Sequence, residues 1–267
     1  MFINKILYRI ILSRQKKFKV NKERPRVVFL DDIITTSFFL ETNYELRELR
    51  KMEFVIKTLL KNSAELVFLD IGANIGNHSL YLNKYFKQTV SFEPNPVVYS
   101  VLKLNTMSTS SIVTVNFGLS SENRTAVLRF DNSNIGGGSI SSRTHEEFTE
   151  QEIILKKLDD ILPSFVDGTV GFLKIDVEGH EGDVILGATE TIKTCQPIIA
   201  FELLAEDSGN QTKLLNVLTE LNYNLFEVCQ KLQLLTKQEK GFMIKPVTIR
   251  ANVDYPFILA LPASLSK

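Results

Sequence analysis

The chain alternates short apolar runs with helix-like segments, and this alternation restricts the fold more than any other feature. The run Leu66–Asp70 is apolar up to its last residue, as in a strand buried on both faces of a sheet. A helical pattern at 77–86 and a strand pattern at Thr89–Glu93 follow, and then Asn95 is placed to cap a helix that begins at Pro96. Repeated βα units indicate a mainly parallel sheet with helices on both faces, in which ligands bind at the carboxyl ends of the strands.

The same patterns predict the other elements. Apolar residues at helical spacing predict helices over 45–61, 180–194 and 208–222. Further strands are predicted at Ile112–Phe117, Thr125–Phe130, Val170–Ile175, Pro197–Leu203, Tyr223–Val228, Lys231–Leu235 and Tyr255–Leu261. The polar, glycine-rich segment Asn132–Arg143 is predicted to be a loop that closes over bound ligands.

The first 26 residues differ from the rest of the chain. They hold nine basic residues against one acid, Glu23, and apolar residues are interleaved with them. One hypothesis is a basic amphipathic helix on an anionic membrane. The other, which we favour, is a basic helical extension packed on its own domain or on a partner chain. We therefore divide the chain into residues 1–44, an extension with a hairpin or edge element at 27–41, and residues 45–267, the catalytic domain.

Composition narrows the functional classes. Lys and Arg together number 31, as do Asp and Glu, so no overall field attracts nucleic acid, and we expect no nucleic-acid partner. No run approaches the roughly 20 apolar residues of a bilayer span, and no signal peptide pattern is present. The two cysteines, Cys195 and Cys229, lack metal-binding spacing. A cytoplasmic enzyme, with peripheral membrane contact as the alternative for residues 1–26, is the expected setting.

The loop after the first strand predicts a nucleoside site. Gly72 and Gly76 permit a tight turn and close approach of the main chain to a ligand, but their spacing is not the GxGxxG of pyrophosphate binders. Asp70 at the strand end suits an ammonium better than a phosphate. Because S-adenosylmethionine carries such an ammonium on its amino acid portion, we predict this cofactor.

The next two strand ends complete the predicted nucleoside site. Glu93 is the last residue of the second predicted strand, where its carboxylate can accept hydrogen bonds from both ribose hydroxyls. Pro94 and Asn95 are expected on the adenine side. Gly118 and Leu119, after the third predicted strand, lie where an adenine edge or face would be contacted.

A second polar cluster follows the fourth strand of the parallel set. Lys174, Asp176, Glu178 and Glu181 fall within eight residues, directly after an apolar run. Ionisable groups at such a place are costly unless they line a cleft. A helix N-terminus explains the two glutamates, but neither Asp176 nor the lysine inside the strand.

These motifs resemble those of the FkbM-type methyltransferases. The resemblance rests on Leu69–Gly76, Phe92–Pro96 and Leu173–Glu181, with Phe201-Glu202 in agreement, and it covers residues 40–205. It implies a class I, Rossmann-like fold with a mostly parallel seven-stranded sheet, to which the N-terminal extension is added, and O-methylation of a sugar, glycan or secondary metabolite. It also implies that Asp70, Gly72, Asn74, Gly76 and Glu93 hold the cofactor and that Asp176 faces the reacting centre.

A hydroxyl acceptor needs a base or a metal. Asp176 and His180 are the candidate bases. Alternatively, Asp176 and Glu202, at neighbouring strand ends, could bind Mg²⁺ and a sugar diol, although a third ligand is not evident.

Two other functions remain open from the residues alone. A nicotinamide-dependent oxidoreductase would share Glu93 but lacks its glycine motif here. A non-catalytic module that binds S-adenosylmethionine is disfavoured by the intact acids at 70, 93 and 176.

Overall fold

The computed structural model describes residues 27–28, 45–131, 134–139, 148–203, 208–232, 239–250 and 253–265. The predicted basic extension over 1–26 lies outside the described residues. So does the predicted hairpin over 27–41, apart from Val27 and Val28, and so does part of the glycine-rich segment.

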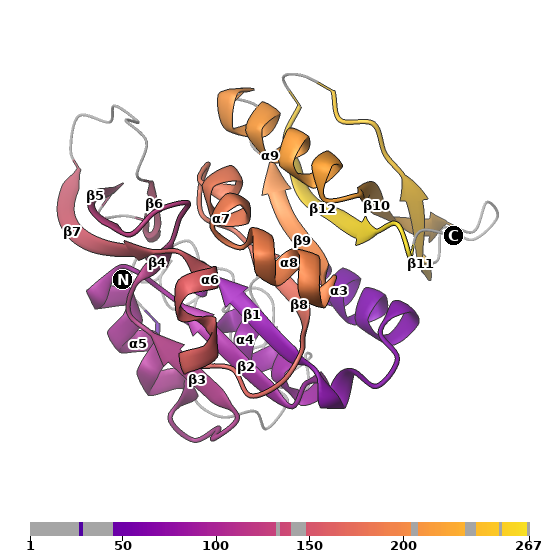
Figure 1. Ribbon diagram of the computed structural model, residues 1–267. Coiled ribbons are helices and arrows are strands. Elements are labelled where there is room, and N and C mark those ends of the chain that lie inside the picture. The colour runs from indigo at the N-terminus through magenta and orange to yellow at the C-terminus, as the bar shows by residue number, and fades with distance from the viewer. Residues whose placement is uncertain are drawn as a thin grey trace, which may run out of the picture.

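The centre of the fold is an eight-stranded mixed sheet (Figure 1). Five neighbouring strands are parallel, and three antiparallel strands extend the sheet beyond β9. In sheet order the strands are β11 (Glu239–Pro246), β10 (Tyr223–Leu232), β12 (Tyr255–Pro262), β9 (Ile198–Leu203), β8 (Val170–Ile175), β1 (Val67–Ile71), β2 (Gln88–Phe92) and β3 (Ile112–Val115). The α/β class and the mostly parallel core are confirmed, whereas the expected number of seven strands is one too few.

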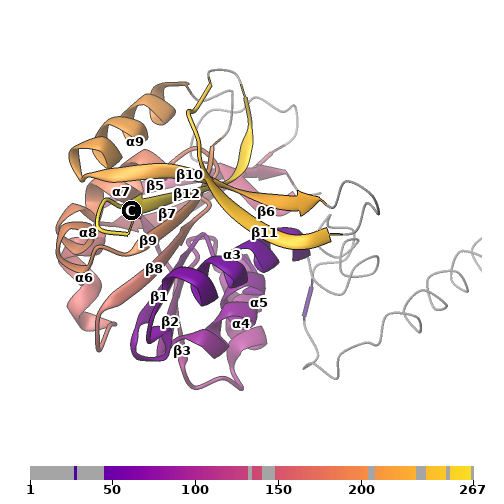
Figure 2. The same cartoon turned by 90° about the vertical axis from the view of Figure 1, so that its right-hand side faces the viewer.

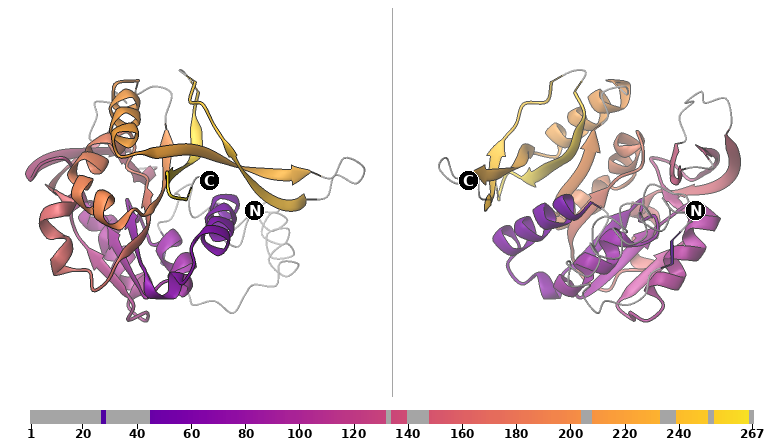
Figure 3. Two further views of the ribbon diagram at one scale, coloured as in Figure 1. Left: turned by 45° about the vertical axis from the view of Figure 1, so that its right-hand side comes forward. Right: turned by 180° about the vertical axis from the view of Figure 1, so that it is seen from behind.

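The extra strand comes from the C-terminal part of the chain. Two short strands were predicted at Tyr223–Val228 and Lys231–Leu235, but the structure has one long strand, β10, and its antiparallel partner is β11. The β10–β11 pair projects past α3 in Figures 2 and 3. β11 has only a short apolar run, Phe242–Ile244, between charged residues and Gly241, so its sequence does not predict a long strand.

A smaller sheet follows β3. Its order is β4 (Gly118–Leu119), β7 (Thr149–Lys156), β5 (Arg124–Asp131) and β6 (Asn134–Ser139). The prediction of a strand at 125–130 is confirmed. The prediction that all of Asn132–Arg143 is a loop is wrong for β6, which pairs with β5 and so satisfies its backbone in spite of three glycines.

Helices cover both faces of the large sheet (Figures 1 and 2). One layer contains α3 (Leu46–Leu59), α4 (Asn77–Leu82) and α5 (Pro96–Thr106), and the other contains α6 (Leu158–Ile161), α7 (Glu181–Gly187), α8 (Thr189–Cys195) and α9 (Ser208–Glu220). The single helix predicted over 180–194 is thus two helices, α7 and α8, which meet at Ala188. Short 3₁₀ turns lie at Ser63–Glu65, Asn83–Tyr85 and Leu162–Ser164.

The two layers bury different side chains of the same strands. Leu69 and Leu173 belong to the core beneath α7 to α9, whereas Phe68 and Phe172 belong to the core beneath α3 and α4. Alternate residues of a strand point to opposite faces, so both sets are apolar. This explains why β1 and β8 are continuous apolar runs in the sequence.

The strand order reverses between β1 and β8. From β1 the chain moves outward to β2 and β3, and it then returns to place β8 and β9 on the other side of β1. Ligands of open α/β sheets bind at the carboxyl ends of the strands beside such a reversal. The carboxyl ends of β1, β2, β8 and β9 are therefore the place to examine for function.

No helix in the described ranges is both long enough and apolar enough to span a lipid bilayer.

Candidate active site

The loop that follows β1 packs directly against the end of β8. Gly72 has a φ of +74°, and a β-carbon there would lie 1.8 Å from the carbonyl oxygen of Asp176. Only glycine fits this contact. Asn74 and Gly76 also have positive φ, of 52° and 91°, before α4 begins at Asn77. The three loop residues predicted to hold a cofactor thus lie at the strand reversal.

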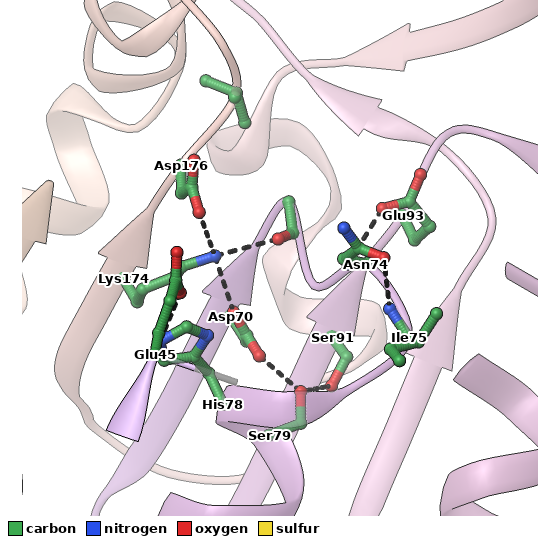
Figure 4. A network of polar contacts seen from close by, with 12 residues as sticks. Glu45, Asp70, Asn74, Ile75, His78, Ser79, Ser91, Glu93, Lys174 and Asp176 are labelled. Carbon is green, nitrogen blue, oxygen red and sulfur yellow. Dashed lines mark hydrogen bonds and ion pairs between the residues drawn. The ribbon is translucent and has the colours of Figure 1, made fainter. Parts of the chain in front are cut away.

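Lys174, on β8, is the centre of the polar network in Figure 4. Its Nζ donates to the carbonyl oxygen of Gly72 at 2.9 Å, and it lies 3.1 Å from Oδ2 of Asp176 and 3.6 Å from Oδ1 of Asp70. Burial alone would lower the pKa of this amine, but Asp176 and Asp70 outweigh burial and raise it above its ordinary value. Lys174 is therefore a fixed cation that joins the end of β8 to the end of β1 and the loop after it.

Asp70 lies in the interior beneath the loop. Its side chain has no exposed surface, and Oδ2 accepts a hydrogen bond from the hydroxyl of Ser79, which is itself bonded to Ser91 at 2.8 Å (Figure 4). Burial raises the pKa of Asp70, while Lys174 and Ser79 oppose the shift. This geometry makes Asp70 a positioning residue. Its direct contact with the ammonium of a ligand stays a prediction.

Glu93, directly after β2, connects two loops. Oε2 accepts a hydrogen bond from the backbone N–H of Asn74 at 3.0 Å, and Oε1 accepts one from the N–H of Asn95 at 2.9 Å. These bonds use about half of the roughly four lone-pair positions of a carboxylate. Burial raises the pKa of Glu93 to about 7, and the two N–H groups oppose the shift. The carboxyl group is thus held in place with capacity for further donors.

Asn95 caps α5, as predicted from the sequence. Its Oδ1 accepts from the N–H of Val97 at 3.0 Å, and Pro96 is the first helical residue. The side chain is only 1% exposed, yet its Nδ2 has no hydrogen-bond partner among the described residues. A buried amide group without a partner is costly, so this donor is suited to a ligand atom.

The remaining residues predicted on the adenine side lie next to Glu93. Asn116 donates from Nδ2 to the carbonyl oxygens of Glu93 and Pro94, at 2.9 and 3.2 Å. A β-carbon at Gly118 would lie 3.4 Å from Pro94. Leu119 is buried in the main core beneath this region. The contacts of Pro94, Gly118 and Leu119 with a nucleoside stay predictions.

Asp176 and Glu202 form a carboxyl pair at the ends of the neighbouring strands β8 and β9. Burial would raise the pKa of Asp176, but Lys174, His78 and a hydrogen bond with Glu202 outweigh burial and lower it. Burial and the negative charge of Asp176 together raise the pKa of Glu202 to about 8. Near neutral pH the pair therefore shares one proton, which Glu202 holds, and Asp176 is ionised.

A pocket of about 160 Å³ opens beside this pair. Asp176, Glu202 and Lys174 form part of its wall, and α3 contributes further residues, among them Glu48 and Met52. The pocket lies on the β8–β9 side of the loop after β1, whereas Glu93 lies on the β2 side.

His78, the second residue of α4, also lines this pocket. Its Nε2 is 3.5 Å from Oε2 of Glu45, and it has no hydrogen-bond partner among the described residues. Burial and the charge of Lys174 together lower the pKa of His78 to about 3, although the charge of Asp176 opposes the shift. The imidazole is therefore neutral near physiological pH and adds no positive charge to the pocket.

His180, the second candidate base, lies outside the pocket wall. Its Nε2 is 3.0 Å from the hydroxyl oxygen of Ser120, and its Nδ1 is 3.7 Å from Oδ2 of Asp183. These contacts hold the ring against β4 and α7. The structure therefore brings Asp176, but not His180, to the wall of this pocket. A catalytic role for His180 stays a prediction.

Glu181 shapes the turn that follows Asp176. Its Oε1 accepts from the N–H groups of Val177 and Gly179, both at 3.2 Å. Burial raises the pKa of Glu181 to about 7, while these N–H groups oppose the shift. The glutamate at the start of α7 therefore stabilises the loop rather than facing a ligand.

Sequence reasoning did not assign three residues that the structure brings to the site. They are Lys174, Glu45 and His78. Lysine within an apolar strand is a signal for the first, since such a charge needs partners. Glu45 and His78 have no comparable signal, because their role depends on how α3 and α4 pack.

Asp176 and Glu202, the two residues predicted to bind Mg²⁺, supply two carboxylates to such a site. Within the described ranges, no group of three or more His, Cys, Asp or Glu side chains is arranged to hold a metal ion. A bound Mg²⁺ ion would therefore depend on water and substrate for its remaining ligands. Metal dependence stays a prediction.

Known methyltransferases are among the proteins that are similar to this chain. A hexuronic acid methyltransferase, AglP, from Haloferax volcanii is 29% identical over 66% of this chain and 73% of its own length. The methyltransferase sdnD from Sordaria araneosa is 30% identical over 53% of this chain and 72% of its own. The crystal structure of methyltransferase FkbM from Methylobacillus flagellatus KT covers 76% of this chain and 45% of its own, with 17% identity and a TM-score of 0.46.

The family profile described as the methyltransferase FkbM domain matches residues 70–230, a range that includes the loop after β1, Glu93, Asp176 and Glu202. The expected family is therefore confirmed, and an oxidoreductase is not supported. The chain is a methyltransferase that belongs to the FkbM methyltransferase family.

Proposed function

We propose that this enzyme transfers the methyl group of S-adenosylmethionine to a hydroxyl oxygen of a sugar, glycan or secondary metabolite. The observation that carries the proposal is the position of Glu93, whose buried carboxyl group is fixed by two backbone N–H groups. The relative from Haloferax volcanii, which is named for a sugar acid, supports a carbohydrate acceptor.

The residues around Glu93 fit S-adenosylmethionine. The carboxylate has lone pairs for two ribose hydroxyls, and the Nδ2 of Asn95 is a buried donor without a protein partner. The loop from Gly72 to Gly76 leaves no side chain between the main chain and a ligand at its two glycines. When bound, the cofactor supplies an electrophilic methyl group on its sulfonium.

Asp176 is the proposed general base. It is ionised because Lys174 lies 3.1 Å away and because the proton of the carboxyl pair resides on Glu202. Methyl transfer forms a carbon–oxygen bond and breaks the carbon–sulfur bond, and the hydroxyl proton passes to Asp176. A hydroxyl nucleophile needs such a base, whose contribution is typically about 10²- to 10⁴-fold.

Ligand binding and transfer are tested separately. S-adenosylhomocysteine should raise the melting temperature of the protein, because a ligand that binds only the folded state stabilises it. NAD should not. Transfer of a labelled methyl group to a sugar or secondary-metabolite hydroxyl then tests the reaction. Stabilisation by S-adenosylhomocysteine without transfer to any acceptor would favour the alternative of a binding module.

A further inference from the structure

We infer that the outer face of α5, formed by Val97, Leu104 and Met107, binds an anionic membrane surface together with the basic residues of the segment 1–26. Contact of this kind is peripheral, because the protein lies on the bilayer and does not cross it. The inference concerns the place where the enzyme works and not the reaction that it catalyses. It therefore goes beyond the proposed function and does not depend on it.

The outer face of α5 is an exposed apolar stripe. Val97 is 49% exposed, Leu104 is 53% exposed, and Met107, the C-terminal cap of the helix, is 78% exposed. Residues seven and three positions apart lie on one face of a helix, so the three side chains point the same way. α5 packs beside β3, the edge strand of the large sheet, at the margin of its helix layer (Figure 1). A stripe in this position can meet a flat external surface.

The stripe belongs to a stretch of chain without negative charge. Lys103 is exposed on α5, one position before Leu104. Between Glu93 and Glu122 the sequence contains no Asp and no Glu. This stretch therefore carries no charge that an anionic surface would repel, and its one charged side chain would be attracted.

The basic segment joins the described structure at the same helix. The backbone N–H of Val27 donates to Oδ1 of Asn105 at 2.7 Å, and Nδ2 of Asn105 donates to the carbonyl oxygen of Val27 at 3.0 Å. Asn105 is itself buried, and it also bonds to the carbonyl oxygen of Ile75, so the anchor is a fixed part of α5. The chain that holds nine basic residues and one acid before Val27 thus leaves the described structure beside α5.

An anionic lipid surface matches both the apolar stripe and the basic segment, whereas other occupants match only one of them. Nucleic acid would pair with the basic residues but would leave the apolar stripe unmatched. Packing of residues 1–26 on their own domain, which the sequence alone favours, would cover the stripe. It would also bring nine basic residues to a stretch, 94–121, that has no acid. A bilayer takes apolar side chains into its interface and binds basic ones at its anionic headgroups.

Sedimentation with vesicles tests the inference on the full chain. The protein is mixed with vesicles of phosphatidylcholine alone, or of phosphatidylcholine and phosphatidylglycerol in equal amounts, and the sedimented fraction is measured. Binding is expected with the mixed vesicles only, and added salt should weaken it because salt screens the charges. No sedimentation with either kind of vesicle, or equal sedimentation with both, would overturn the inference.

Charged substitutions in the stripe test the part that α5 plays. Leu104→Glu and Met107→Glu should each weaken binding to the mixed vesicles at least about tenfold, since an apolar contact is lost and a negative charge is added. Ile154→Glu is the matched control, because Ile154 is 50% exposed on β7 of the smaller sheet, and it should leave binding unchanged. Circular dichroism establishes that each variant is folded. Unchanged binding in both stripe variants would assign any binding to residues 1–26 alone and overturn the inference.

Neutralisation of lysines tests the part that the basic segment plays. The quadruple variant Lys16→Gln, Lys17→Gln, Lys19→Gln and Lys22→Gln should weaken binding at least about 100-fold, because each basic residue near an anionic surface contributes about fivefold. Lys193→Gln, at an exposed lysine of α8, is the control and should leave binding unchanged. Binding that persists at full strength in the quadruple variant would overturn the inference.

Two measurements without vesicles identify other occupants of the outer face. A dimer that Leu104→Glu dissociates, found by light scattering in a protein that binds no vesicles, would assign the face to a second copy of the chain. Deletion of residues 1–26 that lowers the melting temperature, again in a protein that binds no vesicles, would assign the face to the chain's own segment. Either result would overturn the inference and leave the proposed methyl transfer untouched.

Discussion

The ammonium of Lys174 lies 3.1 Å from the carboxylate of Asp176, and both belong to the segment where β8 ends. The contact has two consequences. It keeps Asp176 ionised beside the pocket, and it secures a buried lysine whose other neighbours are Asp70 and the carbonyl oxygen of Gly72. Stability and reactivity of the site therefore depend on the same cation.

The first prediction concerns Lys174→Met. Removal of one partner from a buried ion pair leaves an uncompensated charge, so the variant should lose about 3–5 kcal/mol of unfolding free energy. Urea denaturation measures this loss. Lys193→Met is the matched control, because Lys193 is exposed and pairs with Glu190, and such surface pairs contribute about 0–1 kcal/mol. Equal losses in the two variants would show that Lys174 does not hold the site together.

The second prediction concerns Gly72→Ala. The added β-carbon would meet the carbonyl oxygen of Asp176 at 1.8 Å in a backbone of positive φ, so we expect at least about 2 kcal/mol of lost stability and weaker binding of S-adenosylhomocysteine. Gly209→Ala is the control, because nothing lies within 4 Å of a β-carbon there. Since Gly209 lies in α9, alanine should stabilise that helix by up to about 1 kcal/mol. Wild-type stability of Gly72→Ala would contradict the close packing.

The third prediction concerns the pH dependence of cofactor binding. Glu93 has a pKa of about 7 in the free protein because it is buried. Ribose hydroxyls donate to its ionised form, so binding lowers this pKa and releases a proton below pH 7. The affinity for S-adenosylhomocysteine should thus be constant above about pH 8 and fall by up to tenfold per pH unit below 7. Calorimetric titration between pH 5.5 and 8.5 measures the change.

Two variants identify the group that titrates. Glu93→Gln should weaken binding and remove its pH dependence. Glu181→Gln should keep that dependence, although the pKa of Glu181 is also about 7, because Glu181 bonds to its own loop. A pH dependence that disappears only with Glu181→Gln would assign the titration to that residue.

The strands β1 and β8 and the loops around Gly72 and Asn95 were predicted well from the sequence. Burial on both faces makes β1 and β8 continuous apolar runs, and such runs are recognisable in the sequence. The tight turn at Gly72 requires glycine, so this turn is recognisable as well. The helix cap at Asn95 could also be predicted, because its side chain bonds to the backbone only two residues further along the chain.

The arrangement of the residues around the pocket could not be predicted from the sequence. Glu45 directly precedes α3 and His78 lies in α4, and the two meet only because α3 and α4 pack on the same face of the sheet. His180 appeared to be a candidate base because it follows Asp176 closely in the sequence, but its ring lies against Ser120, 60 residues away in the chain. Contacts between distant segments depend on packing, which residue spacing does not reveal.

The fourth prediction separates the two candidate bases. Asp176→Asn should lower kcat by about 10²- to 10⁴-fold, the usual contribution of a general base. His180→Gln should change kcat by no more than about threefold, since glutamine can still bond to Ser120 and polar substitutions of this kind cost little when a partner is kept. Rapid-quench measurement of methyl transfer, with S-adenosylmethionine saturating, isolates this step.

The control for this comparison is Asp160→Asn, an exposed carboxylate that bonds to Asn123 and lies away from the pocket. It should leave kcat unchanged. Because Asp176 also partners Lys174, stability and S-adenosylhomocysteine affinity are measured for each variant, and a loss of kcat in a folded, cofactor-binding Asp176→Asn protein is attributable to the missing base. A large loss in His180→Gln with near-normal turnover in Asp176→Asn would instead make His180 the base and require its ring to leave Ser120 during the reaction.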